Sequence, residues 1–192
     1  MRIIATDLPE VLVLEPNVFQ DGRGYFLESY NRRAFAHAAG VAVDFVQDNH
    51  SKSARNVLRG LHYQRPPREQ AKLIRVVSGR AFDVAVDIRP GSPRFGQWTG
   101  VELSADNFRQ LWIPAGFAHG FLALEDDTQL LYKTTDYYAK ELETSILWND
   151  STIGIHWPLQ GNEAPQLSAK DAAAATLAET AIALGRNMTM PR

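Results

Sequence analysis

Short strand-like segments follow one another along this chain, and turn-forming residues separate them at intervals of about 8–12 positions. Ser78-Gly79-Arg80 and Arg89-Pro90-Gly91-Ser92-Pro93 are two of these turns. This spacing is typical of an all-β sandwich or barrel. Strands are predicted at Val11–Leu14, Tyr25–Tyr30, Phe45–Asn49, Leu58–Tyr63, Leu73–Val77, Ala81–Ile88, Gly100–Leu103, Arg109–Ile113, His119–Leu124 and Gln129–Thr134.

The segment Phe82–Ile88 shows the clearest alternation of residue types. Successive side chains of a strand point to opposite faces of its sheet. The Phe, Val, Val and Ile side chains should therefore share one face and point into a core, with Asp83 and Asp87 on the other face.

Two helices are predicted outside this pattern. Asn31 can cap a short helix over Arg32–Ala39, which Gly40 would end. Near the C-terminus, Ser168 precedes an Ala-rich run that reaches about Leu184 and has a strong helical propensity.

Length and composition favour one domain over residues 1–192, with a barrel core at about 11–160 and a helical tail at about 168–184. The 45% content of hydrophobic residues excludes intrinsic disorder. With 20 Lys and Arg against 22 Asp and Glu, the net charge of −2 argues against a general nucleic-acid binder. No stretch approaches the roughly 20 apolar residues that cross a bilayer, so no membrane partner is expected.

The absence of Cys excludes disulfides, thiolate metal sites and a Cys nucleophile. It agrees with a reducing compartment. Asp7 comes too early for a signal peptide, and no apolar region follows it. A cytoplasmic location is the expectation.

Two polar clusters interrupt the apolar pattern, at Gln47–Ser51 and within Leu58–Gln64. Such residues can line a pocket inside a barrel, although ordinary burial statistics favour the solvated face of a sheet. A third candidate is His119, which begins a strand after the turn at Pro114–Gly116. It can bind a metal, transfer a proton or contact an anion, but a structural histidine is the commoner case.

Other site signatures are missing from the sequence. His62 and His119 have no His-x-His partner, so no metal site is expected. No Gly-x-Ser-x-Gly, Walker A or Gly-x-Gly-x-x-Gly motif occurs. Any bound phosphate would have to be held by side chains such as Arg23, Arg59 and Lys72, each of which is more often an ordinary surface cation.

Taken together, these segments resemble the dTDP-4-dehydrorhamnose 3,5-epimerases, metal-free members of the cupin superfamily, over most of the chain and in the family's order. The matching segments are Phe19–Glu28, Gln47–Ser51, Leu58–Gln64, Gln70–Leu73, Asp83–Arg89, Ser92–Gly96, Pro114–Phe121, Tyr132-Lys133, Tyr137-Tyr138, Ile146–Asp150 and Leu167–Asp171.

The resemblance implies a mainly β, cupin-type jelly-roll β-barrel in a homodimer. It implies a dTDP-4-keto-6-deoxy sugar as substrate and inversion at C3 and C5, which supplies the precursor of dTDP-L-rhamnose. Both carbons flank the C4 ketone, so removal of either α-proton gives an enolate delocalised onto O4. Neither a nicotinamide cofactor nor a metal is required in principle.

By position in the family, His62 would be the general base, and Asp171 the carboxylate that pairs with it. Asp171 has a second interpretation, because Ser168-x-x-Asp171 is also a capping-box pattern, and both roles can hold together. Tyr132 would be the acid on the opposite face of the ring; otherwise it would be a barrel tyrosine. Lys72 would be the cation near O4; otherwise it would be a solvated lysine at a strand end.

The resemblance also assigns substrate binding to Arg23, Glu28, Gln47, Asp48, Asn49, Arg59, Lys72, His119, Tyr138, Glu143 and Lys170. Arg23 and Glu28 would come from the neighbouring subunit. Arg59 and His62 would point to opposite faces of a regular strand, being three residues apart. If both enter one pocket, the strand must bulge or bend, and Gly60 is the natural place.

Three alternatives remain open at this stage. One is a single-centre epimerase or a ketoisomerase acting on a dTDP-keto sugar in the same pocket. Another is a non-catalytic cupin that binds a sugar nucleotide. The third is a metal-dependent cupin oxygenase, against which the missing ligand set argues.

Overall fold

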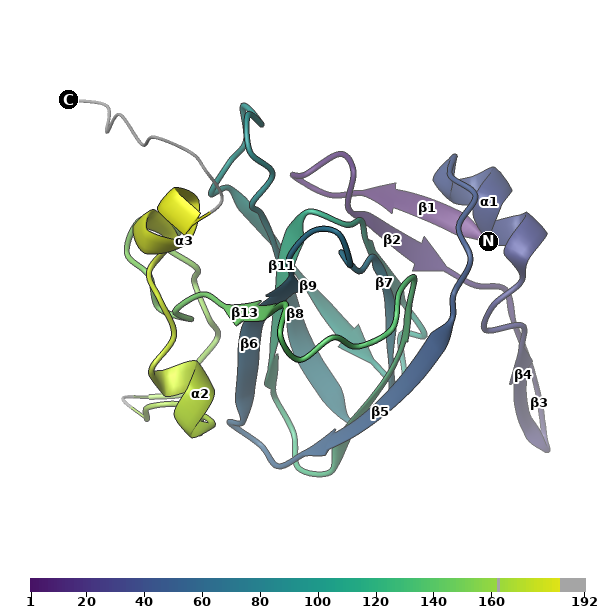
Figure 1. Ribbon diagram of the computed structural model, residues 1–192. Coiled ribbons are helices and arrows are strands. Elements are labelled where there is room, and N and C mark those ends of the chain that lie inside the picture. The colour runs from purple at the N-terminus through teal and green to yellow at the C-terminus, as the bar shows by residue number, and fades with distance from the viewer. Residues whose placement is uncertain (162, 184–192) are drawn as a thin grey trace.

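Two antiparallel sheets stacked face to face form the body of the computed structural model, which describes residues 1–161 and 163–183 (Figure 1). The six-stranded sheet has the order β1-β2-β10-β7-β12-β5. Its strands are β1 (Arg2–Ala5), β2 (Leu12–Glu15), β5 (Gln47–Ser53), β7 (Lys72–Ser78), β10 (Gln110–Ile113) and β12 (Thr128–Thr134).

The second sheet has five strands in the order β13-β6-β11-β8-β9. They are β6 (Leu58–Gln64), β8 (Arg80–Asp87), β9 (Trp98–Ser104), β11 (Phe117–Ala123) and β13 (Glu143–Ser145). A separate hairpin of β3 (Val18–Asp21) and β4 (Gly24–Leu27) projects from the body (Figure 1). In the part of the chain that the structure describes, no ladder joins the two large sheets, so the predicted jelly roll is confirmed as two packed sheets rather than one closed ladder.

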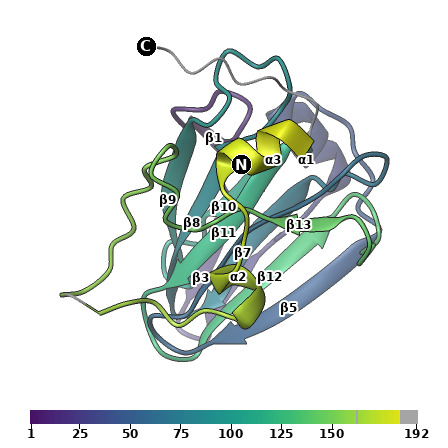
Figure 2. The ribbon, with the colours of Figure 1, turned by 60° about the vertical axis from the view of Figure 1, so that its left-hand side comes forward.

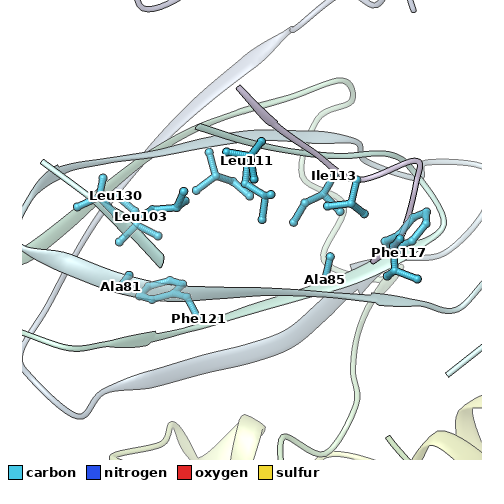
Figure 3. Packing of buried hydrophobic residues seen from close by; sticks show 13 residues of the cluster. Ala81, Ala85, Leu103, Leu111, Ile113, Phe117, Phe121 and Leu130 are labelled. Carbon is cyan, nitrogen blue, oxygen red and sulfur yellow. The ribbon is translucent and has the colours of Figure 1, made fainter. Parts of the chain in front are cut away.

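The main core lies between these sheets (Figure 3). Leu111, Ile113 and Leu130 from the six-stranded sheet meet Ala85 and Phe121 from the five-stranded sheet, and all are buried. These apolar side chains fill one part of the space between the sheets, and polar side chains line the other part.

The outer face of each sheet is also covered. Helix α1 (Arg32–Ala39) packs Phe35 against Trp112, with ring centroids 5.1 Å apart. As predicted, the Asn31 side chain caps α1 by accepting from the Ala34 N–H, and Gly40 ends it with a φ of 69°. The other sheet is covered by the C-terminal segment, which buries Leu177.

Both faces of β8 are therefore buried. Phe82, Val84 and Val86 pack in the outer cluster under the C-terminal segment, which confirms the predicted apolar face. Asp83 and Asp87 lie on the other face, as predicted, but they are fully buried as well, because that face lines the space between the sheets.

All ten predicted strands are present with shifted ends. The strand predicted at Tyr25–Tyr30 stops at Leu27, because the next residues lead into the cap of α1. The strand predicted at Phe45–Asn49 instead runs over Gln47–Ser53. Three short strands were not predicted: β1, β3 and β13.

The prediction of one continuous C-terminal helix was wrong. The structure has α2 (Ala169–Ala172) and α3 (Leu177–Ala183), and the predicted end at Leu184 lies outside the described residues. Between them, Ala175 bridges to Ile146, and its carbonyl accepts from the Leu147 N–H at 2.8 Å. Tertiary pairing therefore overrides the helical propensity of the Ala run.

Candidate active site

A cavity of about 280 Å³ opens between the two sheets. Its walls come from both sheets and from the loop after β12. The lining residues are Gln47, Asn49, Ser51, Arg59, His62, Tyr63, Gln64, Gln70, Lys72, His119, Phe121, Tyr132, Tyr138 and Glu143. Residues of both polar clusters, Gln47–Ser51 and Leu58–Gln64, therefore line one pocket between the sheets. This agrees with the first of the two interpretations, in which these clusters line the interior of the barrel.

His62 on β6 pairs with Asp171 on α2, with Nε2 and Oδ1 2.6 Å apart. The His62 ring is partly exposed toward the cavity, whereas the Asp171 carboxylate is buried. Burial works against ionisation of Asp171, yet hydrogen bonds with His62, with Ser168 and with the backbone of Gly60 hold its pKa below the ordinary value. A carboxylate in this position fixes the imidazole and stabilises its protonated form.

Both interpretations of Ser168-x-x-Asp171 are realised together. The Ser168 hydroxyl accepts from the Asp171 N–H at 3.1 Å and caps α2. The Asp171 carboxylate reaches across to His62.

A bulge in β6 aims Arg59 and His62 into the same cavity. On the neighbouring strand β11, His119 pairs with His62 and Phe121 pairs with Arg59. The two pairs are three residues apart on β6 but only two residues apart on β11, so β6 contains one extra residue. Gly60 adopts a φ of +130° there, and a Cβ at this position would lie 2.5 Å from the Gly120 Cα. The predicted bend at Gly60 is confirmed, and only glycine fits this conformation and close contact.

Tyr132 occupies the opposite wall. It lies on β12 of the six-stranded sheet, whereas His62 lies on the five-stranded sheet, and both line the cavity. Burial, helped by the negative charge of Glu143 and opposed by Arg59, raises the pKa of Tyr132. The phenol therefore keeps its proton at neutral pH and can donate it.

Lys72, the first residue of β7, is buried at the floor of the cavity rather than solvated. Burial lowers the pKa of Lys72 to about 8, against the opposing pull of Asp83 and Glu143. Within residues 1–161 and 163–183, no carboxylate lies within the 4.0 Å of an ion pair with it. The ammonium is therefore available to an anionic oxygen in the cavity.

His119 lines the cavity from β11 and pairs with Asp83, with Nε2 and Oδ1 2.9 Å apart. Burial lowers the pKa of His119, the nearby Lys72 and His62 lower it further, and Asp83 opposes the shift. Asp83 was not among the predicted site residues. The alternation of residues within β8 predicted the correct face of the strand for Asp83. Nothing in the sequence showed that this face contacts His119.

Three further residues form a network at the cavity mouth. The Tyr138 hydroxyl donates to Glu143 Oε2 at 2.9 Å, and Lys170 Nζ lies 2.6 Å from the same oxygen. Burial opposes ionisation of Glu143, but these two partners hold its pKa below the ordinary value. Lys170 and Asp171 both belong to α2, so their contacts with Glu143 and His62 attach this helix to the cavity wall at two points.

The polar run of β5 divides between two faces. Gln47, Asn49 and Ser51 line the cavity, and the Gln47 amide donates to Asn49 Oδ1 at 2.9 Å. Asp48 points to the outer face, where Lys133 Nζ lies 2.8 Å from its Oδ1. The single chain therefore does not bring Asp48 to the cavity.

Arg23 and Glu28 also lie outside the cavity lining. Arg23 is at the tip of the projecting hairpin, highly exposed and paired with Asp21. Glu28 follows β4 and accepts from the Asn31 side chain at 3.1 Å. Of the sequence-derived site residues, these two and Asp48 are the ones that the chain does not bring to the cavity or its mouth.

Several lining residues were not among the predicted ones: Ser51, Tyr63, Gln64, Gln70 and Phe121. Gln64 is the most connected of them, since its side chain accepts from the Ala139 N–H and donates to the Tyr137 carbonyl. All five lie within segments that match the family. The segments therefore predicted the region of the site, but nothing in the sequence showed that these particular side chains line the cavity.

The described ranges 1–161 and 163–183 contain no group of three or more His, Asp or Glu side chains arranged to hold a metal ion. No described helix is long and apolar enough to pass through a membrane.

Comparison with known proteins gives concordant matches. A family model described as dTDP-4-dehydrorhamnose 3,5-epimerase matches residues 5–179. The dTDP-4-dehydrorhamnose 3,5-epimerase of Salmonella typhimurium is 60% identical over 177 residues, which are 92% of this chain and 96% of that protein.

Solved structures agree. A dTDP-6-deoxy-D-glucose-3,5-epimerase from Legionella pneumophila, in complex with dTDP-4-keto-L-rhamnose, superposes with a TM-score of 0.91 at 48% identity, covering 98% of this chain and 99% of that one. A 3′-monoepimerase from Streptomyces bikiniensis, in complex with dTDP-quinovose, has a TM-score of 0.86 at 37% identity, covering 94% and 90%.

Proposed function

This chain belongs to the dTDP-4-dehydrorhamnose 3,5-epimerase family, and on that premise we propose which of its side chains perform the reaction. The enzyme converts dTDP-4-dehydro-6-deoxy-D-glucose to dTDP-4-dehydro-L-rhamnose by inverting C3 and C5, a step in the formation of dTDP-L-rhamnose. The observation that supports our assignment is the position of His62 and Tyr132 on opposite walls of one cavity that also contains Lys72.

His62 acts as the base. Its ring faces the cavity, and Asp171 holds Nε2 at 2.6 Å, so Nδ1 is the nitrogen left to take the proton from C3 or C5. The buried carboxylate stabilises the imidazolium that forms. A general base in this position typically contributes about 10²–10⁴-fold to the rate.

Tyr132 returns a proton to the other face of the same carbon. Inversion requires removal and delivery on opposite faces of the ring, and the two sheets hold a base and an acid in that relation. The raised pKa of Tyr132 keeps the phenol protonated until the enolate forms.

Lys72 stabilises the enolate between these two steps. Abstraction of a proton next to the C4 ketone moves negative charge onto O4, and a buried ammonium opposite that oxygen lowers the energy of the intermediate. Since the charge appears only as the proton leaves, Lys72 acts mainly on the chemical step.

The dTDP moiety is bound by Arg59, Gln47, Asn49 and His119, which line the cavity, and by the network of Tyr138 with Glu143 and Lys170. The Arg59 fork suits diphosphate oxygens. Arg59 donates to the Ser53 hydroxyl and to the Lys52 carbonyl, both at 3.1 Å, and it forms no ion pair with a carboxylate of the described residues.

We propose further that the enzyme is a homodimer in which Arg23 and Glu28 of one subunit complete the site of the other. The hairpin β3–β4 supports this proposal, since it projects from the body and exposes Phe19 and Phe26 by 65% and 69% (Figure 1). Large exposed apolar side chains on one hairpin are typical of an interface. The single domain over residues 1–192 and the cytoplasmic location remain predictions, and we also propose a role in supplying cell-surface polysaccharide.

The function is tested by following dTDP-4-dehydro-6-deoxy-D-glucose by NMR with the purified protein. We expect inversion at both C3 and C5, and loss of this conversion in His62→Ala. Inversion at C3 alone would instead place the chain with the 3′-monoepimerase that it resembles in fold. Tight binding of the sugar nucleotide without any conversion would indicate a non-catalytic cupin.

A further inference from the structure

Asp171 is delivered to His62 by the segment between Gln166 and Leu177, which contains α2 and leads to α3 (Figure 2). This segment contacts β6 and pairs with the residues next to β6 and β13. Backbone pairing fixes this segment at both ends. Upstream, the Gln166 N–H donates to the Asn56 carbonyl at 2.8 Å and the Leu58 N–H donates to the Gln166 carbonyl at 3.0 Å. Downstream, Ala175 accepts from the Leu147 N–H at 2.8 Å.

One side chain adds an attachment to this segment. Asp150 is 6% exposed, and it does not line the cavity. Its Oδ1 accepts from the N–H groups of Thr152 at 2.8 Å and Ile153 at 3.2 Å, which closes the turn after β13. Its Oδ2 accepts from the Leu177 N–H at 2.8 Å, at the first residue of α3.

The two oxygens of Asp150 therefore connect the turn that follows β13, the neighbour of the strand that carries His62, to the segment that carries Asp171. β13 pairs with β6, and Ser145 is directly opposite His62. The turn anchored by Oδ1 follows β13, whereas the residue anchored by Oδ2 comes six positions after Asp171. Leu177 itself is buried in the outer apolar cluster, so this anchor point is packed as well as bonded.

We infer that Asp150 is a positioning residue for the reaction: it holds the C-terminal segment so that the Asp171 carboxylate meets His62. This inference rests on the proposed roles of His62 and Asp171. Asp150 touches neither the cavity nor the pair, so it acts through α2, which carries both Asp171 and Lys170. Its loss should affect proton transfer most, since small displacements of a catalytic group cost about 10²-fold in rate, whereas dTDP keeps the contacts proposed for it outside α2.

Asp150→Asn separates the two functions of the carboxylate. The amide oxygen can still accept from the N–H groups of the turn, but the amide nitrogen cannot accept from the Leu177 N–H. We expect kcat to fall about 10- to 100-fold, with a much smaller change in KM and in the affinity for dTDP. Asp126→Asn is the control, because Asp126 also accepts a remote backbone N–H, that of Arg55 at 2.9 Å, but has no connection to Asp171.

A double-mutant cycle with Asp171→Ala distinguishes positioning from general stability. If Asp150 acts through Asp171, Asp150→Asn causes no further loss of kcat in the Asp171→Ala background. A kcat for Asp150→Asn equal to that of the wild type, or the same fold-loss in both backgrounds, would overturn the inference. If Asp171→Ala itself keeps full activity, the proposed function of the pair fails instead.

Leu177→Pro supplies the reciprocal variant should Asp150→Asn not fold. Proline is tolerated at the first position of a helix, and it removes the N–H donor while leaving Asp150 in place. Because Leu177 is buried in the outer apolar cluster, Leu177→Ala, which shortens the side chain but keeps the N–H, is the matched control. Beyond any effect of Leu177→Ala, the same fall in kcat, a much smaller change in KM and no further effect with Asp171→Ala are expected. Retention of wild-type kcat by a folded Leu177→Pro enzyme contradicts the inference.

Discussion

His62 and Asp171 are 109 positions apart in the chain, yet their side chains meet with Nε2 and Oδ1 at 2.6 Å. The strand β6 presents the imidazole to the cavity, and the short helix α2 brings the carboxylate to it from outside the sheet. The proposed base therefore combines groups from two elements far apart in the chain, and we infer that its activity depends on how the C-terminal segment is held.

The pair gives the first prediction. Asp171→Asn keeps the shape of the side chain but removes the charge that stabilises the imidazolium. We expect kcat to fall by about 10²–10⁴-fold, as for loss of the base itself, while dTDP binds as in the wild type. Steady-state kinetics and calorimetric titration with dTDP measure the two effects; weakened dTDP binding with unchanged kcat would refute the assignment.

Lys72 gives a prediction on pH. The pKa of Lys72 is lowered to about 8, so the ammonium loses its proton as the pH rises through that value and the enolate loses its counter-charge. The kcat/KM profile, which reports groups of the free enzyme, should therefore fall on the alkaline side near pH 8. In Lys72→Arg this fall should move to higher pH, because a guanidinium stays charged. An alkaline limb that is identical in both enzymes would exclude Lys72 as its source.

Some of these relationships follow from the sequence and others do not. Strand-like segments separated by turn residues located all ten predicted strands, and the spacing of Arg59 and His62 predicted a bulge at Gly60 if both side chains enter one pocket. Local patterns of this kind depend on the periodicity of the backbone, which the sequence carries directly.

The features that the sequence did not predict have a common physical cause, which is contact between residues far apart in the chain. The Ala run after Ser168 has every local feature of a helix, but pairing of Ala175 with Ile146 interrupts it. Asp83 is buried against His119 because β8 and β11 pair as neighbouring strands of one sheet, and that pairing joins residues far apart in the chain. The resemblance to a family located His62, Lys72, Tyr132 and Asp171, whereas the residues that hold them are visible only in the structure.

Gly60 gives a prediction on stability. In Gly60→Ala, the left-handed backbone and the contact with Gly120 each cost about 1–3 kcal/mol, so we expect a loss of roughly 2–6 kcal/mol together with a large loss of activity. Gly91→Ala is the matched control, since its φ of +81° is also left-handed but no atom lies within 4 Å of the added Cβ. Chemical denaturation compares them; equal losses in both variants would show that the contact with Gly120 contributes nothing.

The shared site gives a prediction on mixed dimers. Arg23→Ala and His62→Ala should each be inactive as homodimers, because every site lacks one group. After the two proteins are unfolded together and refolded, a heterodimer contains one site with His62 from one chain and Arg23 from the other. Activity should reappear, at about a quarter of the wild-type level, because random pairing makes half of the dimers mixed and each has one intact site. Failure of the mixture to recover activity would contradict a site built across two subunits.

The account rests on a base and an acid on opposite faces of the sugar ring, and solvent-deuterium exchange in Tyr132→Phe tests this most directly. In deuterated buffer, the wild-type enzyme should place deuterium at C3 and C5 with inversion, as read by NMR. Tyr132→Phe retains His62, so it should still exchange the α-protons but return deuterium from the same face, which leaves the configuration unchanged. Inversion at the wild-type rate in Tyr132→Phe would contradict the central claim.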